Sequence, residues 1–433
     1  MVLADPEGRI FDHPNLLMAA QSGIEKRLGN ANGLMPMPEG SQLFTLPGRY
    51  PVGWDPESER FVTIKEIVID GRKLECTAVA AFLAPGYLRC LLPATQLKTE
   101  YPTLPLWAYG AVGFRDEGFC VSGIFVDPNP HWHPRFFRAD DELNARVQDL
   151  QQQYPRNRLV QHLSHCALGY RCFAAKNAFY QRWEIPVPTS PGCNAKCLGC
   201  LSSQPFEGCE ASHKRISFIP TVEEIVEVAL PHMMKAEDPI VSFGQGCEGE
   251  PLLQDRLLEQ TIATLRERTS EGTINVNTNG SLPQVVGRLA AAGLDAIRIT
   301  LGSARPKYYE SYHKPEGYRF ADVLESMGKA KEKGIYLSLN LLVFPGLTDQ
   351  EDEIEALLNM VSMTGVDMIQ MRNLNIDPEW YLKELRDPRA PGIGIPNMLT
   401  LFRRAFPHLV IGYFNRTKES FQKNAGAGEA TQT

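Results

Sequence analysis

Residues 293–301 read Gly-Leu-Asp-Ala-Ile-Arg-Ile-Thr-Leu, and this short stretch shows the pattern that decides the fold. The glycine ends an amphipathic helix, and a strand follows over 295–301 in which apolar residues alternate with Arg298 and Thr300. Side chains point alternately to the two faces of a strand, so one face of this strand is apolar and the other is polar. We expect the apolar face to pack on helices and the polar face to line an interior.

The same unit of strand, amphipathic helix and glycine recurs along the chain. A capping box of Thr348 and Glu351 is expected to open one of the helices. Such alternation predicts parallel strands joined by right-handed crossovers. Because eight strands are needed for the common closed barrel, we predict an α/β fold with a partial (β/α)6 barrel over residues 181–375. The expected strands are 183–187, 239–243, 273–276, 295–301, 335–343 and 366–371.

The inner face of this barrel is expected to be polar. Asn275 and Asn277 share one face of their strand, as do Ser338 and Asn340 of another. Barrel interiors are normally filled with Val, Ile and Leu, and unpartnered buried polar groups are costly, so a polar interior indicates a polar ligand or water. The alternative is a half-exposed antiparallel sheet with its polar face in water. The helices between the strands favour the barrel.

A cysteine-rich loop follows the first expected strand. Residues 191–200 read Pro-Gly-Cys-Asn-Ala-Lys-Cys-Leu-Gly-Cys, which spaces Cys193, Cys197 and Cys200 as Cys-x3-Cys-x2-Cys. Thiolates are soft ligands that suit iron–sulfur clusters or zinc. Iron–sulfur clusters usually have four cysteine ligands, so three would leave one iron open. The alternative is a zinc site completed by Cys209 or His213.

This loop resembles the signature of the radical S-adenosylmethionine (SAM) superfamily, and its place after the first barrel strand is similar too. The resemblance covers about residues 183–375. It implies a radical-SAM-type barrel in which Cys193, Cys197 and Cys200 hold a [4Fe–4S] cluster whose open iron binds SAM. It further implies reductive cleavage of SAM to a 5′-deoxyadenosyl radical that abstracts hydrogen from a substrate, which the sequence leaves open among peptide or protein, RNA and small metabolite. An electron donor such as flavodoxin or ferredoxin is the implied protein partner.

The resemblance also assigns SAM contacts. Gly249, Glu250 and Pro251 are similar to the family's Gly-Glu-Pro element, which receives the SAM ammonium group. Carbonyls and a carboxylate suit a cation, and a glycine permits close approach. The other residues implied for the SAM pocket stand in the strands or just after them: Asn277, Thr278, Arg298, Thr300, Ser303 and Asn340. No residue is assigned as the catalytic group that acts on the substrate.

Two features depart from the family pattern. Gly199 stands where the family usually has an aromatic residue near the adenine, and Leu198 or Leu201 would have to substitute. No cysteine follows Cys247, so we expect none of the cysteine-rich extensions that carry auxiliary clusters in some members. The function class that competes with the enzyme is a metal-stabilised binding or scaffold protein, with zinc or an iron–sulfur cluster, that does not turn over SAM.

The 433 residues carry a formal net charge of −7, which gives no strong signal for nucleic acid. No apolar run of 18 or more residues predicts a membrane span, and no secretory signal is evident at the start. Ten cysteines in a chain without such a signal are more typical of ligands, catalysts or buried thiols than of disulfides. We therefore expect a cytoplasmic protein without a membrane partner.

The parts outside the barrel are expected to form three further units. Residues 1–180 form an N-terminal β-rich α+β accessory module, which begins with a short helix near Leu16 and covers the barrel mouth or recognises the substrate. Residues 376–415 form a C-terminal α/β extension. Residues 416–433, rich in Gly, Ala and Thr, are expected to be a disordered tail.

Two weaker groups remain open. His162, His165, Cys166 and Cys172 are close in sequence and would suit a second metal site, although buried cysteines and structural histidines are common. His131 and His133 lie in a proline-flanked loop. They are either metal ligands or ordinary structural histidines. Cys247 is either a small buried residue or a group that influences the radical step.

Overall fold

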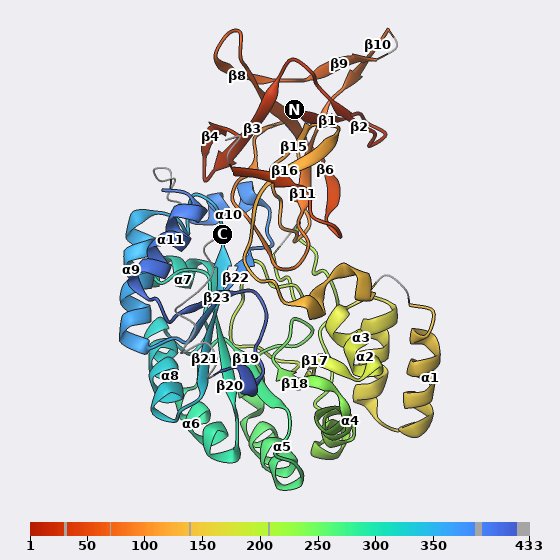
Figure 1. Ribbon diagram of the computed structural model, residues 1–433, viewed down its shortest axis with the longest axis vertical. Helices are drawn as coiled ribbons and strands as arrows, with labels where there is room; N and C mark the ends of the chain where they lie inside the picture. Colours follow the sequence, from red (N-terminus) through yellow and green to blue (C-terminus); the bar gives the residue numbers. More distant parts are fainter. Residues whose placement is uncertain (30–32, 70, 138–139, 207, 386–391, 422–433) are drawn as a thin grey trace.

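The computed structural model describes residues 1–29, 33–69, 71–137, 140–206, 208–385 and 392–421. Figure 1 shows a β-rich part (red to orange) standing on one end of a curved sheet of parallel strands that is surrounded by helices. The β-rich part stands at the end where the parallel strands finish, since it contacts residues that directly follow the strand 368–373. It therefore faces the end of a barrel where ligand sites occur.

The barrel sheet has seven parallel strands in the order of the sequence. All six expected strands are present, which confirms the predicted α/β partial barrel. The seventh strand comes from the predicted C-terminal extension and pairs with the sixth, so that this extension enlarges the barrel sheet. The strands are β17 (Arg182–Pro186), β18 (Glu237–Phe243), β19 (Thr273–Thr278), β20 (Ala296–Leu301), β21 (Tyr336–Val343), β22 (Met368–Asn373) and β23 (Val410–Gly412).

Helices cover the outer face of this sheet (Figure 1). Thr221 and Glu224 form a capping box at the start of α4, which the sequence pattern did not single out. The capping box predicted at Thr348 and Glu351 is wrong, because Thr348 accepts a bond from the Phe344 amide and α9 has Gln350 as its N-cap. The helices are α4 (Val222–Lys235), α5 (Asp255–Arg268), α6 (Pro283–Ala292), α7 (Pro306–His313), α8 (Phe320–Glu332), α9 (Glu351–Thr364), α10 (Pro378–Leu385) and α11 (Ile395–Ala405).

The two faces of the strands divide as predicted. Ile297 and Ile299 belong to the continuous apolar core beneath the helices. On the inner face the Asn275 amide donates to Ser242 Oγ and to Asn277 Oδ1, so neighbouring strands are joined by side-chain bonds. The strands are parallel and polar on their inner face, and the alternative of a half-exposed antiparallel sheet is wrong.

The β-rich part is built from short antiparallel strands. The helix expected near Leu16 is wrong: Leu17–Ser22 is strand β3, which pairs with β4, β7 and β13. The strands are β1 (Val2–Ala4), β2 (Ile10–Asp12), β3, β4 (Glu25–Leu28), β5 (Leu34–Pro36), β6 (Gln42–Leu46), β7 (Arg49–Asp55), β8 (Arg60–Thr63), β9 (Glu66–Ile69), β10 (Arg72–Glu75), β11 (Thr77–Phe82), β12 (Tyr87–Arg89), β13 (Leu92–Pro93), β14 (Thr95–Leu97), β15 (Val112–Arg115) and β16 (Gly118–Phe125).

Three helices between the β-rich part and the barrel pack with the barrel. They are α1 (Leu143–Gln153), α2 (Arg158–Leu168) and α3 (Phe173–Tyr180), and their apolar side chains share one core with Ile185 of β17 and Ile225 of α4. We therefore propose that the accessory module ends near Asp127 rather than at residue 180. Residues 1–127 are called the β module.

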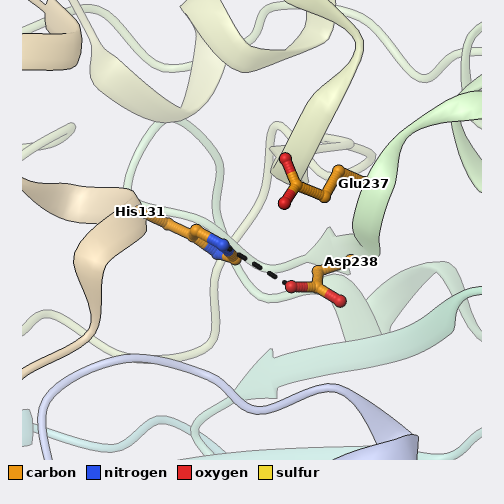
Figure 2. Close-up of side chains that lie close together, drawn as sticks. All are labelled: His131, Glu237 and Asp238. Atoms are coloured by element: carbon orange, nitrogen blue, oxygen red, sulfur yellow. Dashed lines mark ion pairs between the residues drawn. The ribbon is translucent and has the colours of Figure 1, made fainter.

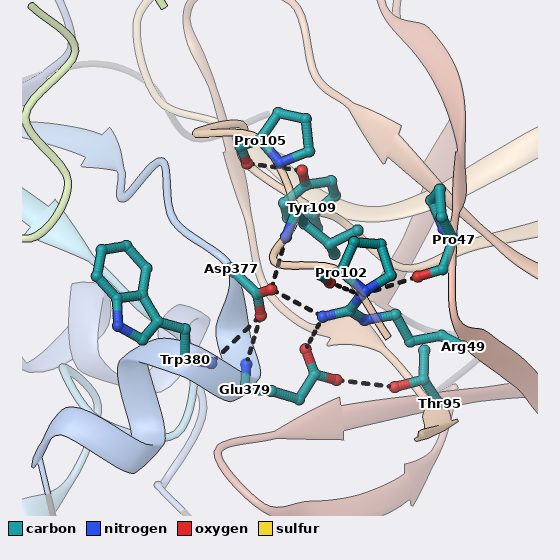
Figure 3. Close-up of polar contacts among 10 residues, drawn as sticks. Pro47, Arg49, Thr95, Pro102, Pro105, Tyr109, Asp377, Glu379 and Trp380 are labelled. Carbon is teal, nitrogen blue, oxygen red and sulfur yellow. Dashed lines mark hydrogen bonds and ion pairs between the residues drawn. The ribbon is translucent and has the colours of Figure 1, made fainter. Parts of the chain in front are cut away.

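A buried ion pair fastens the β module to the barrel (Figure 3). Arg49 at the start of β7 donates to Asp377, 2.7 Å away, and both side chains are almost fully buried. Arg49 also donates to the Pro102 carbonyl, while Asp377 accepts from the Leu104 amide. These bonds fix the β module over the carboxyl end of β22.

The C-terminal residues that the structure describes are packed on the sheet. The Phe421 ring stacks on Tyr336 with centroids 4.0 Å apart, and the Lys418 amide donates to Thr273. Of the tail predicted to be disordered, residues 416–421 thus make specific contacts, and 422–433 lie outside the described residues. Within the described ranges, no helix combines the length and apolar character that a membrane span needs.

Candidate active site

A cavity of about 370 Å³ opens at the carboxyl ends of the barrel strands. The loops after β17, β18 and β19 form one side, and the inner faces of β20, β21 and β22 form another. The β module closes part of the mouth with Phe82, Leu83 and Ala108. This is the end of a barrel where ligand and catalytic sites lie, and the polar strand faces predicted above supply its lining.

All three cysteines of the 191–200 loop line this cavity and are half-buried. Their sulfur atoms are not all within 4.8 Å of one another. A single tetrahedral zinc with Zn–S bonds of about 2.3 Å would require sulfurs about 3.8 Å apart. The wider spacing therefore fits a cluster of several metal atoms better than a single zinc. Burial raises the pKa of the Cys193 thiol to about 11, so metal binding at this position would release a proton.

The two residues considered for completing a zinc site lie elsewhere. The His213 ring bonds to the Gly246 carbonyl at 2.7 Å, and Cys209 packs in an apolar cluster under α10. Among the residues that the structure describes, neither joins the three cysteines in a metal-binding group. The zinc alternative therefore gains no support from the geometry.

Glu248, which the sequence pattern did not single out, ties the cysteine loop to the loop after β18. Its buried carboxylate accepts bonds from the backbone amides of Thr189 and Ser190 and from the Gly244 amide. Burial raises the pKa of Glu248 to about 7 against the effect of these donors. The only feature of the sequence that could have indicated Glu248 is its position, two residues before Glu250 in a glycine-rich loop.

The Gly249–Pro251 element lies directly against the cysteine loop. The Glu250 amide donates to the Gly192 carbonyl, and a Cβ on Gly249 would lie 1.8 Å from that same oxygen. Only glycine permits this approach. Gly249 and Glu250 line the cavity, whereas buried Pro251 begins a short 3-10 helix and is not part of the lining.

The Glu250 carboxylate is engaged within the protein. It accepts bonds from Thr278 Oγ1 and from the backbone amides of Asn279 and Leu252. Burial raises its pKa to about 7. Glu250 therefore joins three loops at the cavity wall. Because its carboxylate already accepts three hydrogen bonds, the backbone carbonyls of the Gly249–Pro251 element are more available to a cation than this carboxylate is.

The other predicted SAM contacts divide into two groups. Ser303 lies outside the cavity and donates to Glu353 of α9, a contact that the sequence pattern did not indicate. The remaining five line the cavity together: Asn277, Thr278, Arg298, Thr300 and Asn340. Sequence spacing alone could not separate the two groups, because Ser303 follows β20 by only two residues.

Three further residues that the sequence pattern did not reveal contact the cysteine loop. His313, at the end of α7, places Nδ1 3.3 Å from Cys197 Sγ. Arg215 directs a guanidinium nitrogen to Cys200 Sγ at 3.5 Å. Tyr312 lines the cavity and lies so close to Gly199 that a Cβ there would be 2.7 Å from its hydroxyl. Tyr312 thus brings an aromatic ring next to position 199, while Leu198 is buried in the core and Leu201 lines the cavity.

The residues present fit a [4Fe–4S] cluster with SAM. Besides the three thiols, the cavity wall contains buried polar atoms without a hydrogen-bond partner, namely Arg298 Nε, Asn340 Oδ1 and Arg372 Nε. Unpartnered buried polar atoms are rare in folded proteins and indicate a missing ligand or water. The donors and acceptors suit a polar molecule that carries both charge signs, as SAM does.

The second metal site considered at 162–172 is not assembled. Among the described residues, His162, His165, Cys166 and Cys172 do not come together as a metal-binding group. Cys166 lies 3.6 Å from His162, and hydrogen bonds with Cys247 and with His162 lower the pKa of Cys166 to about 5. Cys247, in the same loop as Gly249, is thus a hydrogen-bond partner of the free thiol of Cys166.

The loop histidine His131 takes part in a surface cluster (Figure 2). It stacks on Trp183 and lies 3.5 Å from Asp238, with Glu237 beside it, at the amino end of β18. This end of the strand is opposite to the cavity. Because both carboxylates are exposed, and such groups are common without an ion, the cluster carries no metal assignment.

The fold is an α/β partial barrel, and its cavity brings three thiols together at the carboxyl ends of the strands. Residues 187–359, which make up most of the barrel, match the sequence family of the radical SAM superfamily. This confirms the resemblance stated above, and with it the enzyme class. The superfamily uses a [4Fe–4S] cluster and SAM, so the expected cofactors are also confirmed at the level of the family.

Similar proteins with curated names span several activities. The chain is 29% identical over 231 residues to "Molybdenum cofactor biosynthesis protein 1" of Bos taurus, covering 52% of this chain and 33% of that protein. It is 30% identical over 172 residues to "GTP 3',8-cyclase" of Streptomyces coelicolor, covering 39% and 47%. The chain spans a third to about two fifths of the length of the first curated relatives it matches.

Solved structures resemble the chain more distantly. The hydrogenase maturase HydG from Carboxydothermus hydrogenoformans is 15% identical, with a TM-score of 0.40 over 66% of this chain and 74% of that one. Methylornithine synthase PylB is 14% identical, with a TM-score of 0.38 over 67% and 81%. No residue role is taken from likenesses of this size.

Proposed function

We propose that this protein is a radical SAM enzyme that cleaves SAM at one [4Fe–4S] cluster held by Cys193, Cys197 and Cys200. When bound, the cluster and SAM would supply an electron and a 5′-deoxyadenosyl radical that abstracts hydrogen from a substrate. The observation that carries this proposal is that the three cysteines, the Gly249–Glu250 backbone and unpartnered polar atoms all line one cavity.

The chain's own residues would divide the work of binding SAM. Gly249 lines the cavity, and its carbonyl would suit the ammonium group of SAM, since the Glu250 carboxylate is engaged with three donors. The Arg298 guanidinium suits the SAM carboxylate, because charge-assisted bonds between these groups are strong. Thr278 and Asn277 shape the wall between them, and Tyr312 beside Gly199 suits the adenine.

The β module would keep water from the reaction. Phe82, Leu83 and Ala108 place apolar surface over the cavity mouth, and exclusion of water prevents side reactions of reactive intermediates. Replacement of both Phe82 and Leu83 by Ser should raise the amount of SAM cleaved without substrate, while iron content stays unchanged. A doubly substituted protein with the wild-type rate would remove this role from the module.

We propose flavodoxin or ferredoxin as the electron donor and a cytoplasmic location. The cluster cysteines are half-buried rather than sealed, which leaves the cluster within reach of a docked donor. All ten cysteines are free, and free thiols persist in reducing compartments.

The experiment that tests this function is anaerobic reconstitution of the full chain with iron and sulfide. The proposal expects about four irons per chain and release of 5′-deoxyadenosine when dithionite and SAM are added. Cys193→Ala, Cys197→Ala and Cys200→Ala should each abolish that release, whereas Cys76→Ala, in the β module, should not. One zinc per chain and no 5′-deoxyadenosine would support the scaffold alternative instead.

A further inference from the structure

Two arginine side chains stand next to each other in the cavity wall without an acidic partner. Arg298 of β20 is 8% exposed, and Arg372 lies two strands away on β22. The Nε atom of each is buried and makes no hydrogen bond. Within the part of the chain that the structure describes, neither guanidinium forms an ion pair with a carboxylate. Arg298 is buried and Arg372 is half-buried, and two like charges this close repel each other unless an anion binds beside them.

A neutral amide joins the two guanidinium groups. Gln370 Oε1 accepts from Arg298 at 3.0 Å and lies 3.5 Å from a nitrogen of Arg372. The Gln370 amide nitrogen donates to Asn415 Oδ1, which fixes the oxygen toward the arginines. The protein thus orients both groups without cancelling either charge, and the Tyr413 ring covers one face of Arg372 at 4.1 Å.

The carboxylates near this pair are committed to other donors. Glu184 accepts from Ser242, Gln245 and Asn415 through one oxygen. Glu248 and Glu250 are held by the backbone amides described above. Burial and the nearby Arg372 lower the pKa of Arg298 to about 9, while the charge of Glu184 acts in the opposite direction. Glu184 supplies a negative charge nearby but no ion pair, so a bound anion would be the first direct anionic partner of either guanidinium among the described residues.

We propose that the substrate carries an oxyanion, a carboxylate or phosphate group, which Arg372 binds beside SAM. This inference rests on the proposed function. SAM brings a single carboxylate, which Arg298 would take, and this leaves the half-buried Arg372 guanidinium to bind a second anion. Arg372 pairs in register with Leu342 and lies over the Tyr413 ring, and Leu374, two residues further on, accepts a bond from Arg89 of the β module. The anionic group of the substrate would therefore lie near the β module.

The test uses the full-length, cluster-loaded protein saturated with SAM, so that Arg298 is already engaged. Inorganic phosphate and, separately, acetate are titrated calorimetrically into the wild type, Arg372→Gln and Arg372→Lys. Arg288→Gln is the matched control, because it removes the same charge from the outer surface of α6. SAM affinity is measured for each variant in parallel.

At least one anion should bind to the SAM-loaded wild type, and Arg372→Gln should weaken it about tenfold or more, since a charge-assisted bond is lost. Arg372→Lys should fall between them, and Arg288→Gln should match the wild type. Preference for phosphate or for acetate would identify the substrate's group. The inference is overturned if neither anion binds, if Arg372→Gln binds equally well, or if Arg372→Gln also loses SAM. SAM cleavage by the wild type would leave the proposed function standing in each of these cases.

Discussion

His313 Nδ1 lies 3.3 Å from the sulfur of Cys197, while Nε2 of the same ring accepts a hydrogen bond from the Gly302 amide at 3.1 Å. Burial lowers the pKa of His313 to about 3, so the ring is neutral and has one proton. Because Nε2 is an acceptor, that proton is on Nδ1 and points to Cys197. His313 therefore donates a hydrogen bond to a sulfur of the proposed cluster site.

The first prediction concerns the reduction potential of the cluster. Hydrogen bonds to the sulfurs help set this potential, and a donor stabilises the more negative reduced state. His313→Leu should make the midpoint potential more negative, measured by anaerobic redox titration followed spectroscopically. His313→Asn, which keeps a donor at the Nδ1 position, should stay closer to the wild type. Equal potentials in all three proteins would remove this role from His313.

The second prediction concerns the contact between the two cofactor loops. Gly249→Ala places a Cβ 1.8 Å from the Gly192 carbonyl and must push the loops apart. We expect SAM affinity to fall by at least about tenfold, which corresponds to about 1.4 kcal/mol, as measured by equilibrium binding to the reconstituted protein. Gly192→Ala is the control, since its Cβ would meet only Leu253 at 3.9 Å. Equal losses in both variants would argue against a specific role for Gly249.

The third prediction concerns the attachment of the β module. Arg49→Met leaves Asp377 buried without its cation, and breaking a buried pair in this way costs about 3–5 kcal/mol. The free energy of unfolding from urea titrations should fall by about that amount. Arg288→Met removes a half-exposed pair with Asp255 and should cost less than about 1 kcal/mol. Similar small losses in both variants would show that the Arg49 pair does not hold the module.

The fourth prediction concerns acid stability at the start of α4. A side-chain hydrogen bond from Arg158 lowers the pKa of Glu224 to about 2, against an ordinary value of 4.5. The folded state thus binds the proton less readily than the unfolded state, and the stabilisation is complete above pH 4.5 and lost as pH falls toward 2. In the iron-free chain, Glu224→Gln should be less stable than the wild type at pH 7, with a smaller difference at pH 3.

A matched control separates this effect from general acid sensitivity. Glu142 pairs with Arg146 on an exposed helix surface, so Glu142→Gln should change stability little at either pH. A difference between the wild type and Glu224→Gln that stays constant from pH 7 to pH 3 would contradict the assigned pKa.

The barrel could be predicted because its signals are local. Each strand alternates between apolar and polar residues, and glycines such as Gly293 and Gly365 end helices in the left-handed conformation. The seventh strand, β23, was missed because it is only three residues long and has no full period of alternation. The residues of the short strand β3 do not predict a strand by themselves. This strand is stabilised by pairing with β7 and β13, which are far away in sequence.

The site was predictable only where a motif carried it. The three cysteines and the Gly249 element have fixed spacing, whereas His313, Arg215 and Glu248 reach the site through tertiary packing. Ser303 shows the converse: its position after a barrel strand suggested a cofactor contact, but α9 supplies Glu353 as its partner. A residue just after a strand can face either the cavity or the helices. The alternation of side chains ends with the strand, so it does not predict which of the two such a residue faces.

The most direct test of the central claim is the electron paramagnetic resonance spectrum of the reconstituted, dithionite-reduced protein, recorded with and without SAM. If three cysteines hold a [4Fe–4S] cluster with an open iron, the reduced protein should show a cluster signal, and SAM should change its shape by binding that iron. A protein that shows no cluster signal, or one whose signal SAM leaves unchanged, would contradict the account.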